Sequence, residues 1–210
     1  MKEFYVERPA EVDVYHHSNG TDVILRKNIA QEKDEEGNER WACEEAQVRL
    51  AGTVAEASVH ADFARYWAVA TGEEPLYDVK QRKIAAMSEA CRAAIVAGFN
   101  VALSDGKGHH FSLTVEDQLN MNALFDLMAS GAEQVPYHAD GEQCAYFSAT
   151  DMSAVIEAAT AHKTWHESYF NSLKTYINSK RTAATVDAIF YGIDIPAQYQ
   201  SDVLQTLQEA

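Results

Sequence analysis

Apolar and polar residues alternate from Glu11 to Leu50, and turn-forming residues interrupt the alternation. A period of two is typical of β-strands that bury one face. The pair Asn19-Gly20 favours a tight hairpin, because Asn and Gly tolerate positive φ angles, and a second, charged turn surrounds Gly37. The pattern predicts a small antiparallel meander with the apolar positions Val12, Val14, Val23, Leu25, Ile29, Trp41, Val48 and Leu50.

The second turn carries the charged run Glu32-Lys33-Asp34-Glu35-Glu36. Charge runs of this kind are most often solvated loops, and we interpret this one in that way. An acidic docking patch or a cation site is the alternative.

The period changes to three and four between Val54 and Ala70, which predicts a helix. Its apolar face carries Val59, Phe63, Tyr66, Trp67 and Ala70, and we expect this face to cover the sheet. Gly72 ends the helix and Glu73-Glu74-Pro75 forms a linker. We therefore predict a β-rich domain with a covering helix over residues 1–75.

Residues 76–210 are predicted to form a mainly helical domain with two inserted β-hairpins, so that the whole chain is α+β. The turn signals of the hairpins are Asp105-Gly106 and Asp140-Gly141. Helix starts are marked by Thr114, with Asp117 three residues on, and by Ser148 or Thr150. The predicted helices are 80–97, 115–130, 151–179 and two short helices in the tail.

The helix Asp151 to Ser179 has an apolar stripe too long for one hairpin to bury. Other helices or another chain must cover it, and we regard this stripe as the clearest need for a partner. Its members are Met152, Val155, Ile156, Ala159, Trp165, Tyr169, Leu173, Tyr176 and Ile177.

Charge and cysteine content narrow the classes of partner. The formal net charge of -15 argues against binding to the nucleic-acid backbone and favours a cationic or amphipathic partner. The cysteines Cys43, Cys91 and Cys144 are odd in number and far apart, so no disulfide framework is expected, and a reducing cytosol is the expected compartment. No apolar run reaches the roughly 18 residues of a membrane span, and we expect neither a membrane anchor nor a secretion signal.

The one candidate for metal chemistry combines two histidines on a helix with two residues of a hairpin. His162 and His166 are four residues apart and share a helical face, while His138 and Cys144 flank the second hairpin. Imidazole and thiolate ligands suit zinc in a tetrahedral shell. Structural histidines are the preferred interpretation, because the pattern lacks the intervening Glu of a metalloprotease helix.

No other arrangement indicates chemistry. The adjacent pairs His16-His17 and His109-His110 would point to opposite faces of a strand, so we expect exposed residues near turns rather than chelating pairs. The sequence contains no Gly-x-Ser-x-Gly elbow and no phosphate-binding loop. We expect no enzymatic activity and no cofactor.

The order helix, hairpin, helix, hairpin, long helix resembles a domain family of unknown function. This family recurs at the C-terminal end of phage and prophage tail-fibre and other tail-associated proteins. The resemblance covers about 130 residues and is carried by Arg82-Lys83-Ile84, Ala93 to Phe99, Phe111 to Thr114, Tyr146 to Ala149, His162 to Thr164, Tyr169 to Leu173 and Tyr191-Gly192-Ile193. The segments Asp22 to Ile29 and Trp41 to Glu45 are similar to a β-rich N-terminal region of prophage proteins from Gram-positive bacteria.

The resemblance implies a noncatalytic phage or prophage tail component, associated with the fibre or baseplate. Its expected partners are other tail proteins or further copies of itself, with synthesis in the host bacterial cytoplasm and a final place in the virion tail. A tail-fibre assembly chaperone, absent from the mature particle, is the first alternative. An enzyme acting on cell-wall or surface glycans is the second, and it would need a deep cleft lined by carboxylates. The many carboxylate pairs of an acidic chain arise by chance and do not favour it.

Overall fold

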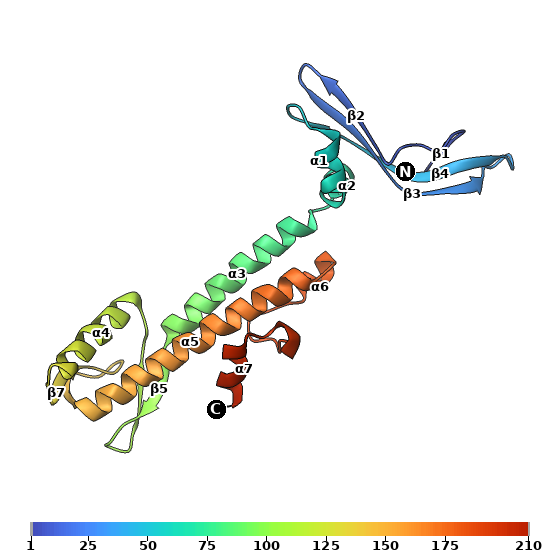
Figure 1. The fold of residues 1–210 in the computed structure, drawn as a ribbon. Helices are drawn as coiled ribbons and strands as arrows, with labels where there is room; N and C mark the ends of the chain where they lie inside the picture. The colour runs from blue at the N-terminus through green and yellow to red at the C-terminus, as the bar shows by residue number, and fades with distance from the viewer. Residues whose placement is uncertain (1, 210) are drawn as a thin grey trace. The chain divides into compact units, whose positions relative to one another are not determined.

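The computed structural model describes residues 2–209 and divides the chain into two compact units, residues 1–79 (unit 1) and 80–210 (unit 2). Unit 1 contains a four-stranded antiparallel sheet, and unit 2 is helical with two β-hairpins (Figure 1). The predicted α+β class is therefore confirmed. The division falls inside the first turns of helix α3 (Leu76–Ala97), which begins directly after Pro75. Pro is tolerated there because the first N–H groups of a helix have no partner within it.

The sheet of unit 1 has the strand order β1-β4-β3-β2. Strands β2, β3 and β4 form the predicted meander, with Ser18 and Asn19 in the first turn and Asp34 to Asn38 in the second. Strand β1 pairs with β4 along the other edge, a pairing between segments far apart in sequence that alternation did not predict. The strands are β1 (Lys2–Tyr5), β2 (Val12–His17), β3 (Gly20–Lys33) and β4 (Glu39–Leu50).

Two helices cover one face of this sheet where one was predicted. The break lies at Asp62, whose φ of -132° and ψ of 41° leave the helical region, between α1 (Glu56–Ala61) and α2 (Phe63–Thr71). Asp is a weak former of helix interiors, and its backbone ends α1 and begins α2. The predicted aromatic face does pack on the sheet, with Val59 fully buried against Val12, Val23 and Leu25.

The opposite face of the sheet is held by Arg26, which is only 5% exposed. Its guanidinium donates to Asp13 of β2 at 2.6 Å and to Glu45 of β4 at 2.7 Å. It also lies against Tyr5 of β1 and donates to the carbonyl of Ala10 at 3.1 Å. Burial disfavours its charge, but the hydrogen bonds to Asp13, Tyr5 and Glu45 outweigh burial and raise its pKa. One β3 side chain thus links all strands of the sheet.

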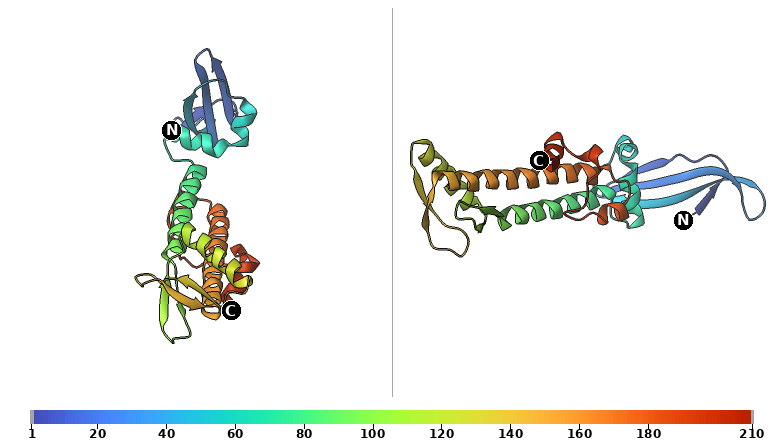
Figure 2. Two further views of the ribbon diagram at one scale, coloured as in Figure 1. Left: turned by 90° about the vertical axis from the view of Figure 1, so that its left-hand side faces the viewer. Right: turned by 90° about the horizontal axis from the view of Figure 1, so that it is seen from below.

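Unit 2 is built along helix α5 (Ala149–Ser179). Helix α3 lies beside it in both figures, with hydrogen bonds from His162 and from Lys80 to carbonyls of the facing helix (Figures 1 and 2). The remaining elements are β5 (Phe99–Ala102), β6 (Gly108–Phe111), α4 (Val115–Ala129), β7 (Gln134–Tyr137), β8 (Ala145–Ser148), α6 (Ala183–Asp187), a 3-10 turn (Ala197–Tyr199) and α7 (Asp202–Glu209).

Local capping fixes where α4 and α5 begin. Thr114 and Asp117 form a reciprocal capping box, with the side chain of each accepting from the backbone N–H of the other. At the start of α5, Ser148 accepts from the backbone of Asp151 at 3.1 Å. Both starts agree with the prediction, since a side-chain oxygen satisfies an N–H that has no partner within the helix.

Unit 2 covers the apolar stripe of α5 itself, which is the first of the two predicted alternatives. The expectation that this stripe is the clearest need for a partner is therefore wrong. Six of its nine predicted members are buried, and the hairpins, α4 and the tail supply the cover. Ile156, Trp165 and Tyr176 are half-buried. The buried members are Met152, Val155, Ala159, Tyr169, Leu173 and Ile177.

The second hairpin has a longer connection than the predicted Asp-Gly turn. Its loop spans residues 138–144, because strand pairing ends at Tyr137 and Ala145. The loop is held by the first hairpin: the backbone N–H of Asp140 donates to the carbonyl of His110 at 2.9 Å, and Ala139 is buried in the core. The predicted turn at Asp140-Gly141 forms inside this loop, with the N–H of Glu142 donating to the carbonyl of Ala139 at 3.1 Å, and the contacts with the first hairpin hold it in place.

Replacing Arg26 by Met should lower the free energy of unfolding by roughly 2–5 kcal/mol, because Asp13 and Glu45 lose their shielded cation. Urea unfolding followed by the fluorescence of Trp41 and Trp67, with Trp165 replaced by Phe, measures the change in unit 1. Arg49→Met is the matched control, since its bidentate pair with Asp22 lies on a side chain that is 54% exposed. Equal losses in both variants would contradict the role of Arg26.

Replacing Gly98 by Ala should destabilise unit 2 by roughly 2 kcal/mol or more. Gly98 has a φ of 81°, and an added Cβ would lie 2.0 Å from the carbonyl oxygen of Phe111. Gly108→Ala in the same hairpin is the control, because nothing lies within 4 Å of its added Cβ. Thermal unfolding by circular dichroism compares them, and similar midpoints for the two variants would refute this constraint.

Candidate functional site

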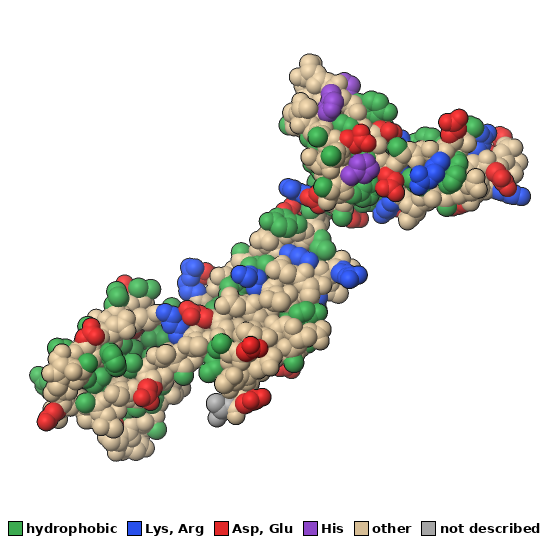
Figure 3. Space-filling model, in the orientation of Figure 1, with side chains coloured by type: hydrophobic (Ala, Val, Ile, Leu, Met, Phe, Trp, Pro, Cys, Tyr) green, Lys and Arg blue, Asp and Glu red, His purple; other side chains and the backbone are tan. Residues whose placement is uncertain are grey.

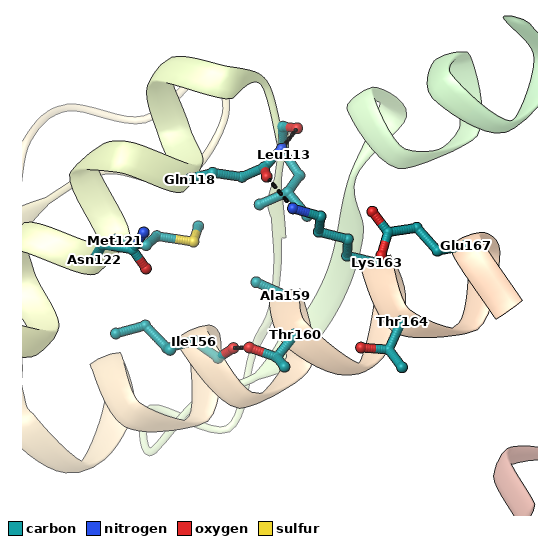
Figure 4. A pocket seen from close by; sticks show the side chains of 10 residues that line it. All are labelled: Leu113, Gln118, Met121, Asn122, Ile156, Ala159, Thr160, Lys163, Thr164 and Glu167. Atoms are coloured by element: carbon teal, nitrogen blue, oxygen red, sulfur yellow. Dashed lines mark hydrogen bonds between the residues drawn. The ribbon is translucent and has the colours of Figure 1, made fainter. Parts of the chain in front are cut away.

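A groove of about 300 Å³ lies between α4 and α5 in unit 2. Its floor is apolar and its rim is polar (Figure 4). The floor is formed by Leu113, Met121, Ile156 and Ala159, and the rim by Gln118, Asn122, Thr160, Lys163, Thr164 and Glu167.

Internal hydrogen bonds engage three of the six polar side chains at the rim. Lys163 Nζ donates to Gln118 Oε1 at 2.7 Å, and Gln118 Nε2 donates to the carbonyl of Leu113 at 3.2 Å. Thr160 donates to the carbonyl of Ile156 at 2.8 Å. The lining residues include neither a histidine nor a cysteine. This chemistry suits an apolar side chain with one polar end better than a reacting group.

The structure places His162 and His166 side by side, with ring centroids 4.5 Å apart, but it engages both in other contacts. His162 Nε2 donates to the carbonyl of Ala94 at 3.1 Å, so this nitrogen carries a proton and is not free to ligate. His166 Nδ1 lies 3.0 Å from the hydroxyl of Tyr191. Both rings join α5 to α3 or to the tail.

The other two candidates lie in the loop of the second hairpin. His138 stacks on Tyr137 with ring centroids 5.6 Å apart, and Cys144 is exposed. Throughout residues 2–209, no group of three or more His, Cys, Asp or Glu side chains is placed to hold a metal ion. The geometry therefore does not bring the four metal candidates together.

His109 is less exposed than sequence reasoning expected. Its side chain is 12% exposed and lies between two carboxylates, 3.2 Å from Asp105 and 3.0 Å from Glu142. The hydrogen bond to Asp105 raises its pKa, and Glu142 adds to that effect. Its neighbour His110 pairs with Asp140 at 2.9 Å. The two rings join the loop of the second hairpin to the first hairpin. The sequence does not show this, because the paired residues are about 30 positions apart.

Helix α4 presents an apolar row to solvent. Val115, Leu119, Ala123 and Leu127 recur every fourth residue and are all exposed, the three larger ones by 67%, 64% and 51%. We call these four residues the α4 row. Figure 3 shows hydrophobic side chains gathered over α4 and the neighbouring part of α5. Sequence analysis missed this row, because α4 is apolar on several sides and only the fold reveals which side is covered.

The sequence profile of the family described as "Domain of unknown function (DUF4376)" matches residues 78–195, more than half of the 210-residue chain. The match confirms that the second part of the chain carries a domain of unknown function, while the link to phage tails stays a prediction. Searches of curated proteins and of solved structures give no significant match. None of the helices within residues 2–209 is long and apolar enough to cross a membrane.

The contact of His166 with the tail should make unit 2 sensitive to acid. Burial lowers the pKa of His166, and His162 lowers it further. Below about pH 6.5 the unfolded chain binds a proton that folded His166 resists, so stability falls as the pH falls. His166→Gln keeps a polar partner for Tyr191 and should lose less unfolding free energy than wild type between about pH 7 and about pH 5.5.

Scanning calorimetry at both pH values measures this difference. His60→Gln is the control, because the side chain of His60 is 47% exposed in α1 of unit 1. A pH dependence of His166→Gln equal to that of wild type would contradict the assignment.

Proposed function

This chain belongs to the family of the domain of unknown function DUF4376, and we propose that it is a noncatalytic structural component of a phage or prophage tail. Its place would be at the fibre or baseplate, where it contacts other tail proteins. The exposed α4 row carries this proposal. Contiguous exposed apolar surfaces on soluble domains often mark interaction sites, because a bound partner removes the apolar surface from water, which is favourable.

Residues that carry the resemblance form contacts that hold the fold of unit 2 together, and this supports a structural role. Lys83 donates to the carbonyls of Asp187 and Ile189 at 3.0 and 2.9 Å and so holds the end of α6. Tyr169 is buried and its hydroxyl accepts from the N–H of Gly192 at 2.9 Å. The shared motifs thus specify the fold of unit 2. The surface residues between the motifs can vary from one family member to another and so bind different partners.

A tail-fibre assembly chaperone remains the alternative function. The same α4 row, on a chain with a net charge of -15, would equally suit transient binding during assembly. The two functions differ in one observable, the presence of the chain in finished particles.

Mass spectrometry of purified phage or prophage particles from the encoding strain tests the proposal. We expect peptides of this chain at a stoichiometry similar to that of other minor tail proteins. Presence in the induced lysate and absence from particles would favour the chaperone. Hydrolysis of purified cell-wall glycans by the pure chain, lost on Asp or Glu substitution, would contradict both.

A further inference from the structure

The α4 row is exposed because helix α4 packs on the core of unit 2 through a different side. The helix turns Met121, Leu124 and Met128 towards the core, and these residues lie on one side of it. The α4 row lies on another side, because a step of four residues advances only slightly around a helix. It runs over thirteen residues, from the first turn of α4 to the last, a length that matches about three and a half turns of a partner helix.

Carboxylates accompany this row. Glu116 lies one turn before Leu119, and Asp126 lies one turn after Ala123. Within residues 2–209, neither carboxylate forms an ion pair or hydrogen bond with another side chain. They are free to meet cations supplied from outside.

The surrounding segment is strongly acidic. Residues 99–160, which form both hairpins, α4 and the first part of α5, contain nine Asp and Glu residues and one Lys or Arg, Lys107. Lys163 of α5 adds a second cation, which is bonded to Gln118 of α4 at 2.7 Å. A net negative charge around an apolar row favours a cationic partner and raises its association rate. It disfavours a second copy of the same acidic surface and an anionic lipid surface, since like charges would meet.

We infer that the α4 row binds a basic amphipathic helix of a partner protein. Apolar side chains of the partner helix pack along Val115, Leu119 and Leu127, and its Lys or Arg residues meet Glu116 and Asp126. In this binding mode the partner helix lies along α4. Burial of apolar side chains supplies the affinity, and the charged residues supply the specificity. The inference deepens the proposed tail function by naming the chemistry of the partner that this unit recognises.

The test uses the full-length chain and two synthetic helical peptides of about 18 residues with Leu at helical spacing. One peptide has Lys at the polar positions and the other has Glu. Isothermal titration should detect the Lys peptide and give at least about tenfold weaker binding of the Glu peptide. Equal binding of both peptides would overturn the inferred charge preference.

Variants locate the binding surface. The double change Leu119→Ser and Leu127→Ser should weaken binding of the Lys peptide by about tenfold or more, because two apolar contacts are lost. The matched control is Phe190→Ser with Val203→Ser, which alters exposed apolar residues elsewhere in unit 2. Circular dichroism checks that both double variants keep the wild-type fold. Equal affinity of the two double variants would overturn the inference.

Charge variants distinguish binding at the α4 row from a general attraction of the Lys peptide to an acidic protein. Glu116→Gln with Asp126→Asn should weaken binding of the Lys peptide by about threefold to tenfold and reduce its dependence on salt. Asp202→Asn with Glu209→Gln removes the same charge from α7 and should change little. Light scattering adds one further outcome: a wild-type dimer that the serine variants dissociate would identify a second copy as occupant and overturn the inference.

These results are independent of the particle test. Absence from particles with the expected peptide binding would refute the tail component and keep the surface, whereas presence in particles without peptide binding would refute the surface alone.

Discussion

The burial of α5 is the constraint on which unit 2 depends. A helix of 31 residues with an apolar stripe along its length is unstable alone in water, so other elements must exclude water from that stripe. Helix α3, the two hairpins, α4 and the tail each cover a part of it. The polar contacts of Tyr169 and His166 then fix the tail on the same helix. The stripe is covered within the chain, and the apolar row that unit 2 leaves exposed lies on α4.

Helix α4 leaves an apolar row exposed because its sequence is apolar on more than one side. Burying Met121, Leu124 and Met128 uses one side, and the capping box at Thr114 fixes where the helix starts. The exposed apolar row and its free carboxylates remain. The histidines, by contrast, are engaged in holding elements together, which explains why they attract attention in the sequence without forming a metal group within residues 2–209.

Sequence patterns were reliable where the cause is local. The caps at Thr114 and Ser148, the hairpin turns and the spacing of the apolar face of α1 and α2 all depend on residues within a few positions of one another. The pairing of β1 with β4 and the contact of Asp140 with His110 depend on segments roughly 30 to 40 residues apart, and no period records them. The groove between α4 and α5 and the α4 row follow from such long-range packing, so neither could be predicted from the sequence.

The central proposal is that unit 2 covers its own apolar core and presents α4 to a protein partner. Electron cryomicroscopy of the chain in complex with the proteins that it binds tests it most directly. We expect a helix of a neighbouring protein to cover Val115, Leu119 and Leu127, with Lys or Arg beside Glu116 and Asp126. A density map in which α4 faces solvent while another surface of unit 2 contacts the neighbours would contradict the claim.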